Sequence, residues 1–245
     1  MELTLETLKS QGDQLAQNTM VPANTDSAAT KLDVTFVTAN TIGLKCNTMP
    51  GNHPNDYANL VAIWQNAESI PWGTDPIKTM TCTENTPSFD MVFPGLDITN
   101  NSYIVGYAVG SELVKGQKYG NICATAYIPA IGDASAYPAF SPSLKVTYIG
   151  TNSVAVDFVL PSGQTPQTNG AWIGIWPAEQ ASYNNPPRAA NSIQVDSYAG
   201  TAFINGIKIG RGLTYTVALF TSGWGGGTGP NNQHMMACSV TFTNQ

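Results

Sequence analysis

The two histidines, His53 and His234, are the only imidazoles that this chain offers for catalysis or metal binding. Both lie in segments with the composition of loops, and their sequence contexts share nothing. A catalytic or metal role needs several ligands that converge, or a nucleophile beside an activating base. His53 with Asp56 is the best candidate metal pair, but a solvated loop explains it more simply. We therefore predict no catalytic residues, no metal site and no cofactor.

The other residues that could do chemistry do not form a known motif. The sequence contains no nucleophile elbow, no phosphate-binding P-loop and no His-Glu-x-x-His pattern. The glycine-rich stretch from Gly223 to Gly229 lacks the Lys-Ser/Thr that would hold a phosphate. Asp97 to Asn101 could contribute to a Ca²⁺ site, and a turn explains it more simply. A non-enzymatic protein is the expectation, with an enzyme of unrecognised type as the third alternative.

Large aromatic residues in loops are the remaining candidates for a site. Trp72 follows a proline-rich turn, Trp224 lies within the glycine-rich stretch, and Tyr57 and Tyr183 flank the central strands, the latter beside Asn184. Aromatic rings on uncharged polar loops suit stacking on sugars or docking on a protein surface. The alternative is that each ring folds back over its own domain as a lid. We predict that these five residues bind a neutral ligand, with carbohydrate as the natural candidate.

An internal repeat determines which elements must position these residues. Trp172–Trp176 (WIGIW) has a counterpart in Leu60–Trp64 (LVAIW), and the offset is 112 residues (176 − 64 = 112). The same offset aligns Gly51 with Gly163. Such a repeat indicates two similar domains. Each apolar run is expected to form a central strand, with its tryptophan as the filler of the core.

The spacing of apolar residues predicts β-strands throughout both repeats. From Lys31 onward apolar and polar residues alternate, and turn signals recur every eight to twelve residues or so, as in immunoglobulin-type sandwiches. The predicted fold is all-β, with two tandem immunoglobulin-like antiparallel β-sandwiches and a short N-terminal helix. The predicted domains are 1–30 (helix and linker), 31–128 (first sandwich), 129–143 (linker) and 144–245 (second sandwich).

The second repeat resembles the SKICH type of immunoglobulin-like domain. In that pattern an Asp-Trp-Ile-Gly-Ile-Phe-like strand follows a proline-bearing loop, as Trp172–Trp176 does here, and Tyr183 and Tyr215 follow in the same order. The chain departs from the pattern at Ala171, where the family carries an acid, and the first repeat has Asn59 there. SKICH domains serve in membrane recruitment and partner binding, so the resemblance implies a non-catalytic sandwich.

The composition of the chain limits the classes of partner that it is expected to bind. The 245 residues carry a net charge of −6 with only 11% charged residues, and the ten Lys and Arg are scattered. Nucleic acid, which needs basic patches, is therefore not an expected partner. No apolar stretch is long enough for a transmembrane segment. A weakly charged surface favours neutral ligands, a protein surface or a homo-oligomer. A structural protein that self-assembles into oligomers or filaments is the second functional alternative.

The chain start and the cysteines bear on the cellular compartment. The acidic N-terminus, with Glu2 and Glu6, does not have the pattern of a secretory signal. We expect a cytoplasmic protein unless it is exported by another route or supplied as a mature chain. The four cysteines form no Cys-x-x-Cys pair, and Cys123 aligns with Cys238 in the repeat. We predict four buried free thiols, with a Cys46–Cys123 disulfide as the alternative.

Overall fold

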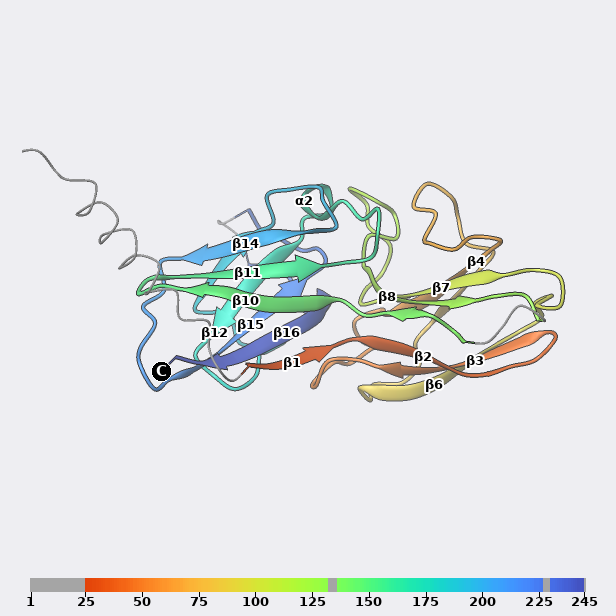
Figure 1. Cartoon of the computed structure of the whole chain (residues 1–245), viewed down its shortest axis with the longest axis horizontal. Helices are drawn as coiled ribbons and strands as arrows, with labels where there is room; N and C mark the ends of the chain where they lie inside the picture. The colour runs from red at the N-terminus through yellow and green to blue at the C-terminus, as the bar shows by residue number, and fades with distance from the viewer. Residues whose placement is uncertain (1–24, 132–135, 227–229, 245) are drawn as a thin grey trace, which may run out of the picture.

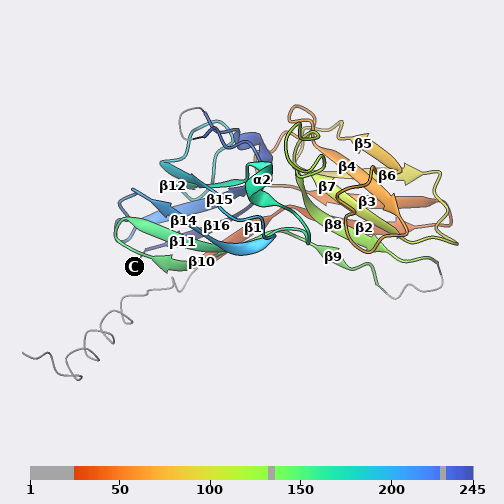
Figure 2. The ribbon, with the colours of Figure 1, turned by 90° about the horizontal axis from the view of Figure 1, so that it is seen from above.

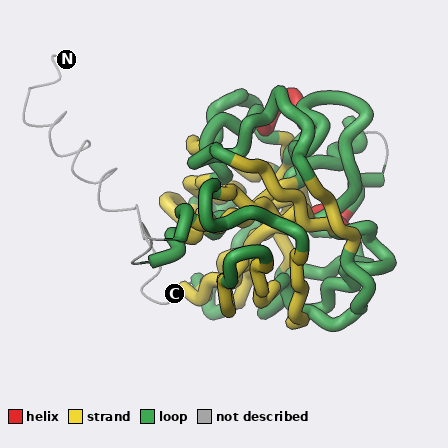
Figure 3. The backbone as a smooth tube through the Cα atoms, turned by 90° about the vertical axis from the view of Figure 1, so that its right-hand side faces the viewer, coloured by secondary structure: helices red, strands yellow, loops and turns green. Residues whose placement is uncertain are grey.

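The computed structural model describes residues 25–131, 136–226 and 230–244, and within them the protein is built almost entirely from antiparallel strands. Strands and loops make up nearly the whole backbone, with helix confined to very short stretches (Figure 3). The predicted all-β sandwich fold is confirmed. The predicted N-terminal helix lies outside the described residues.

The first domain is a sandwich of a three-stranded and a five-stranded sheet. The smaller sheet contains β2 (Lys31–Val37), β3 (Thr41–Asn47) and β6 (Ser88–Pro94), in that order. The larger sheet has the order β5 (Lys78–Thr81), β4 (Leu60–Gln65), β7 (Tyr103–Ala108), β8 (Ile122–Ile128) and β9 (Ala139–Phe140). Burial alternates strictly along β6, so one face of this strand points into the core and the other to solvent.

The second domain repeats this arrangement strand for strand. Its smaller sheet contains β10 (Ser143–Ile149), β11 (Ser153–Val159) and β14 (Ala199–Asn205). Its larger sheet has the order β13 (Ala189–Ser192), β12 (Trp172–Trp176), β15 (Thr214–Phe220), β16 (Met236–Thr243) and β1 (Thr25–Ala29). Two short helical turns, α2 (Pro166–Asn169) and η1 (Gln233–Met235), interrupt its loops. The repeat in the sequence is thus a repeat of the fold.

Each domain contributes one strand to the larger sheet of the other domain. Strand β1 pairs with β16 of the second domain and runs, after the buried Thr30, directly into β2 of the first (Figure 1). In the same way β9 pairs with β8 of the first domain before the chain enters β10 of the second. The segments predicted as linkers, residues 21–30 and 129–143, therefore contain strands that join the two domains.

The two domains have separate cores, and the tryptophans of the central strands lie outside them. Val61 and Ile63 of β4 point into the core between the sheets, whereas Trp64 points to the opposite face. Trp172 and Trp176 of β12 are placed in the same way. These tryptophans are buried, as predicted for core residues, but in apolar clusters on the opposite face of each larger sheet instead of between the sheets. Alternate residues face opposite sides of a strand, and both sides are buried here because a loop covers the outer face.

A tyrosine at the start of an equivalent strand ties down a loop in each domain. The Tyr103 hydroxyl accepts a 3.0 Å hydrogen bond from the backbone N–H of Asp97. The Tyr215 hydroxyl accepts a 2.8 Å bond from the backbone N–H of Gly210. Such tyrosine corners are a mark of immunoglobulin-like sandwiches. Both domains are therefore immunoglobulin-like sandwiches.

All four cysteines are buried free thiols, as predicted, and no Cys46–Cys123 disulfide forms. The alignment of Cys123 with Cys238 is wrong by one residue, however. Tyr107 pairs with Ala124, and its counterpart Leu219 pairs with Cys238. Both last strands carry a β-bulge at this place, and the extra residue is Cys123 in the first domain and Ala237 in the second, so Cys123 corresponds to Ala237.

Candidate functional site

The two domains meet along an interdomain seam, formed by the loops at the facing ends of both sandwiches. Trp72 and Tyr183 follow the equivalent strands β4 and β12, and each reaches across to the other domain. Trp72 Nε1 donates a 2.8 Å hydrogen bond to the carbonyl of Ser162, and its ring lies against Gly163. The ring of Tyr183 lies against Gly51. Two residues predicted to bind a ligand are therefore reciprocal contacts between the domains.

The backbone conformation favours glycine at both Gly51 and Gly163, and at Gly163 the close approach of Trp72 adds a steric reason. Both have φ +81°, a left-handed conformation that residues with a side chain rarely adopt. A Cβ atom on Gly163 would also lie only 2.8 Å from Trp72 Nε1, and one on Gly51 would lie 3.6 Å from Tyr183 Cδ2. The match of these two glycines in the sequence repeat thus marks the place where each domain receives an aromatic ring.

On one side of the seam, amide side chains join the domains. The backbone N–H of Gln117 donates a hydrogen bond to Asn169 Oδ1, and Asn169 Nδ2 donates one to Gln117 Oε1. Asn169 lies at the end of α2, where the domains meet (Figure 2). Gln117 Nε2 also donates to the Gly163 carbonyl at 2.8 Å, and the buried Gln164 donates to the Gly120 carbonyl. This side is held by polar contacts, although Gln164 Oε1 and Thr165 Oγ1 are buried there without a hydrogen-bond partner.

At the centre of the seam, Asn121 forms a buried hydrogen-bond network. Its Oδ1 accepts from the hydroxyls of Thr221 at 2.8 Å and Ser222 at 2.7 Å, and its Nδ2 donates to the Ser111 carbonyl at 2.8 Å. Sequence analysis did not identify these residues. Asn, Thr and Ser are common on this protein's surface, so composition carried no signal for them.

On the other side, aromatic rings replace the amides. The Tyr57 ring stacks on His234, with centroids 3.9 Å and planes 11° apart, and on Tyr183 at 5.4 Å and 25°. The ring of His53 lies 5.8 Å from Tyr57. Both histidines therefore contact one tyrosine, although their sequence contexts are unrelated. His53 Nδ1 lies 3.7 Å from Asp56 Oδ2, and both side chains are more than half exposed.

Burial shifts the pKa values of two residues in this aromatic cluster, His234 and Tyr57. The pKa of His234 is lowered because burial disfavours the charged imidazolium. The pKa of Tyr57 is raised, first by burial and then by the nearby Asp56 carboxylate. Both rings are consequently neutral near pH 7.

A pocket of about 150 Å³ opens beside this aromatic cluster. It lies where strand β1 crosses between the domains and the loop after β12 meets the loop after β3. Its lining consists of Asp26, Ala28, Met49, Pro50, Glu179, Gln180, Ala181, Met236, Ser239 and Thr241. Ala28, Met49, Ala181 and Met236 belong to the same apolar cluster as the rings of Tyr57, Tyr183 and Trp224. The pocket and the aromatic rings are therefore parts of one site.

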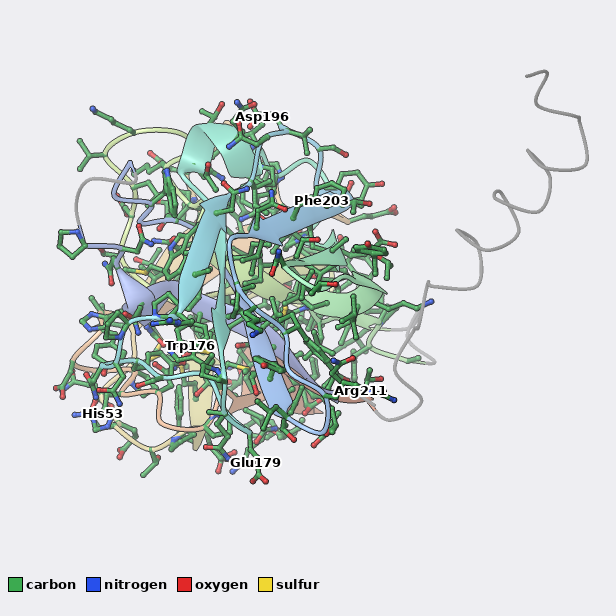
Figure 4. The ribbon with its side chains drawn as sticks, turned by 90° about the vertical axis from the view of Figure 1, so that its left-hand side faces the viewer. His53, Trp176, Glu179, Asp196, Phe203 and Arg211 are labelled. Atoms are coloured by element: carbon green, nitrogen blue, oxygen red, sulfur yellow. The ribbon has the colours of Figure 1, made fainter. Side chains whose placement is uncertain are left out.

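The remaining residues predicted to bind a ligand differ in how close they lie to this site. Trp224 is half-buried, with its ring tilted by 43° at 6.3 Å from Trp172, and Asn184 is exposed. Trp72 belongs to the contact with Ser162 and Gly163 instead. Figure 4 shows His53, Trp176 and Glu179 toward one side of the molecule. The sequence did not predict Asp26 and Glu179 as site residues, because they come together only where strand β1 crosses to the second domain.

Among residues 25–131, 136–226 and 230–244, no group of three or more His, Cys, Asp or Glu residues could hold a metal ion. Within the same ranges, no helix has the length and apolar character needed to cross a membrane. The site as described offers stacking surfaces, hydroxyls, an amide and two carboxylates around an apolar floor.

Comparison with known proteins yields similarity of structure only. No protein-family model matches the chain, so the specific likeness to SKICH domains stays a prediction. No curated protein matches either. Trypsin-activated alpha-2-macroglobulin from Escherichia coli aligns over 92% of this chain and 17% of its own, at 11% identity and TM-score 0.27. The FN1–FN3 domains of chicken CNTN1 align over 93% of this chain and 65% of their own, at 13% identity and TM-score 0.26.

The chain thus spans less than two thirds of either solved structure.

Proposed function

We propose that the chain is a non-enzymatic binding protein whose ligand site is the aromatic side of the interdomain seam. The observation that supports this most directly is the continuity between the pocket and the aromatic cluster around Tyr57. Ligand sites favour interfaces between domains, with an apolar lining and a few converging polar groups. The pocket between Met49 and Met236 has this character.

The proposed ligand is neutral and rich in hydroxyl groups, with carbohydrate as the leading class. The half-exposed ring of Trp224 offers a face on which an apolar ring surface can stack, and Tyr57, which already stacks on His234 and Tyr183, supports this side of the site. Ser239 and Thr241 can donate and accept hydrogen bonds, and the carboxylates of Asp26 and Glu179 can accept from ligand hydroxyls.

A glycan array probed with the full chain, followed by calorimetric titration of any positive glycan, tests this proposal. Tyr57→Ala and Trp224→Ala should each weaken binding about fivefold or more, since an aromatic ring at the site contributes on the order of 1 kcal/mol or more. Trp224→Ala should barely move the melting temperature. Tyr198→Ala, an exposed ring away from the pocket lining, serves as the control.

Binding that is unaffected by Tyr57→Ala would place the ligand elsewhere. An array with no signal above background would reject carbohydrate as the ligand class. A large loss of stability in Trp224→Ala would identify that ring as part of the core.

A second candidate function, a structural protein that self-assembles, is favoured by a separate observation. Each domain exposes an aromatic side chain, Phe36 or Tyr148, on the outer face of its three-stranded sheet. These outer faces carry none of the pocket-lining residues, so ligand binding and assembly are compatible.

A further inference from the structure

A duplicated β-bulge turns one aromatic residue of each domain toward solvent. The register of β2 on β3 shifts between Val34 and Phe36, and that of β10 on β11 shifts between Val146 and Tyr148. The extra residue in each strand reverses the alternation of faces. Phe36 and Tyr148 are consequently 46% and 40% exposed, instead of pointing into their cores.

The bulge creates an apolar row across the outer face of each three-stranded sheet. In the first domain, Phe36 lies opposite Gly43, which lies opposite Val92. In the second domain, the row is Tyr148, Ala155 and Phe203. Val92 and Phe203 are 45% and 53% exposed, and the residue on the middle strand is small in both rows. We call these the first-domain row and the second-domain row.

Figure 4 shows Phe203 on the side of the molecule away from His53 and Glu179. Neither row contains a residue that lines the pocket, so both are distinct from the proposed ligand site. An exposed hydrophobic patch of this kind commonly marks a surface that contacts another protein.

A row of charged residues runs beside each apolar row, and its signs are reversed between the domains. In the first domain, Lys45 on the middle strand pairs with Asp33 on one side and Asp90 on the other. In the second domain, Asp157 on the middle strand pairs with Lys145 and with the uncharged Thr201. The equivalent of Lys45 is thus an acid, and the equivalent of Asp33 is a base.

We propose that the outer face of the first domain binds the outer face of the second domain in another copy of this chain. Packed in this way, Lys45 of one copy faces Asp157 of the next, because both occupy the middle strand. Two first-domain faces would instead place Lys45 against Lys45, and two second-domain faces would place Asp157 against Asp157. Such like-charge contacts are costly, so the charges select the unlike pair of faces.

The geometry of this contact determines the kind of assembly. Each copy has one face of each type, so the contact is heterologous. An open chain of copies leaves one face of each type free, one at each end. The association therefore continues past the dimer, to an open chain or a closed ring. This inference rests on the second candidate function, self-assembly, and is independent of the ligand site.

Sedimentation velocity of the full chain over a range of concentrations tests the proposal. The wild-type protein should form species larger than a dimer as its concentration rises. Lys45→Asp and Asp157→Lys should each weaken association roughly tenfold, since each brings like charges together. The double variant, and an equimolar mixture of the two single variants, should restore association because the opposite charges face one another again.

Two further variants test the apolar rows. Phe36→Ser should weaken association, while Val114→Ser, which removes a fully exposed apolar residue outside both rows, should leave it unchanged. The melting temperature of each variant shows whether it is folded. Larger species that persist in both single charge variants would overturn the proposed contact but leave self-assembly in place. A chain that stays monomeric at its highest soluble concentration would overturn both.

Discussion

The ring of Tyr57, in the first domain, stacks on the ring of His234, in the second, with centroids 3.9 Å apart. By the sequence repeat, the counterpart of Tyr57 is Asn169 (169 − 57 = 112), which joins the domains through Gln117. Equivalent positions thus make the same kind of contact with different chemistry. One side of the seam is a closed amide network, and the other offers aromatic surface beside a pocket.

Lowering the pH should weaken the seam through His234. Burial lowers its pKa in the folded state below the value near 6.5 of the unfolded chain. The stability that this neutral ring contributes is therefore present above about pH 6.5 and is lost as the pH falls through the folded-state pKa. Melting temperatures measured from about pH 7.5 down to pH 5 should fall more for the wild type than for His234→Phe.

His234→Phe keeps the stacked ring and removes the titrating group, so it isolates this contribution from that of the carboxylates. Equal pH dependence in the two proteins would show that His234 is protonated without cost in the folded state.

Replacing Asn121 should destabilise the protein by about 2–3 kcal/mol, because its removal leaves the hydroxyls of Thr221 and Ser222 buried without their shared acceptor. Denaturant unfolding of Asn121→Ala measures this loss. Asn184→Ala, at an exposed position, should change the free energy of unfolding by less than about 0.5 kcal/mol. Similar values for the two variants would contradict the assigned role of Asn121.

Gly163→Ala should be more damaging than Gly206→Ala, although both glycines have a left-handed backbone, with φ +81° and +77°. The strain of a side chain in this conformation costs about 1 kcal/mol at either position. Only at Gly163 would the new Cβ meet Trp72, since no atom lies within 4 Å of it at Gly206. We expect an additional loss of about 1 kcal/mol and a change in tryptophan fluorescence.

The loss of stability in Gly206→Ala measures the contribution of backbone strain alone. Equal losses at both positions would mean that the loop carrying Trp72 moves aside without cost.

The four thiols should be unreactive in the native protein. Burial raises the pKa of Cys82 and of Cys123 to about 12, and it raises the pKa of Cys46 and Cys238 as well. At pH 8 only about one thiol in ten thousand is then a thiolate, which is the reactive form. Ellman's reagent should count close to no thiols in the folded protein and four after denaturation in guanidinium.

Fewer than four thiols after denaturation without reductant would indicate a disulfide. Rapid reaction of one thiol in the native protein would show that its part of the core opens readily.

Several features could be predicted from residue types alone. The alternation from Lys31 onward predicts strands, and the match of Gly51 with Gly163 marks equivalent loops. Tyr57, Trp72 and Tyr183 were singled out because large aromatic rings in polar loops need a partner. The partner could not be named, because the loops meet only after β1 and β9 have crossed between the domains.

The sequence by itself determined the class of fold, the duplication and which aromatic residues lie in loops, because periodicity and residue type act locally along the chain. Only the tertiary structure decided that Trp64 and Trp172 lie on the buried sheet face opposite the core between the sheets. It also decided that both histidines contact Tyr57, and that Lys45 and Asp157 occupy equivalent positions on their middle strands. The physical reason is that strand register, β-bulges and the pairing of exchanged strands are set by contacts between distant segments. One extra residue in a strand reverses which side chains reach solvent.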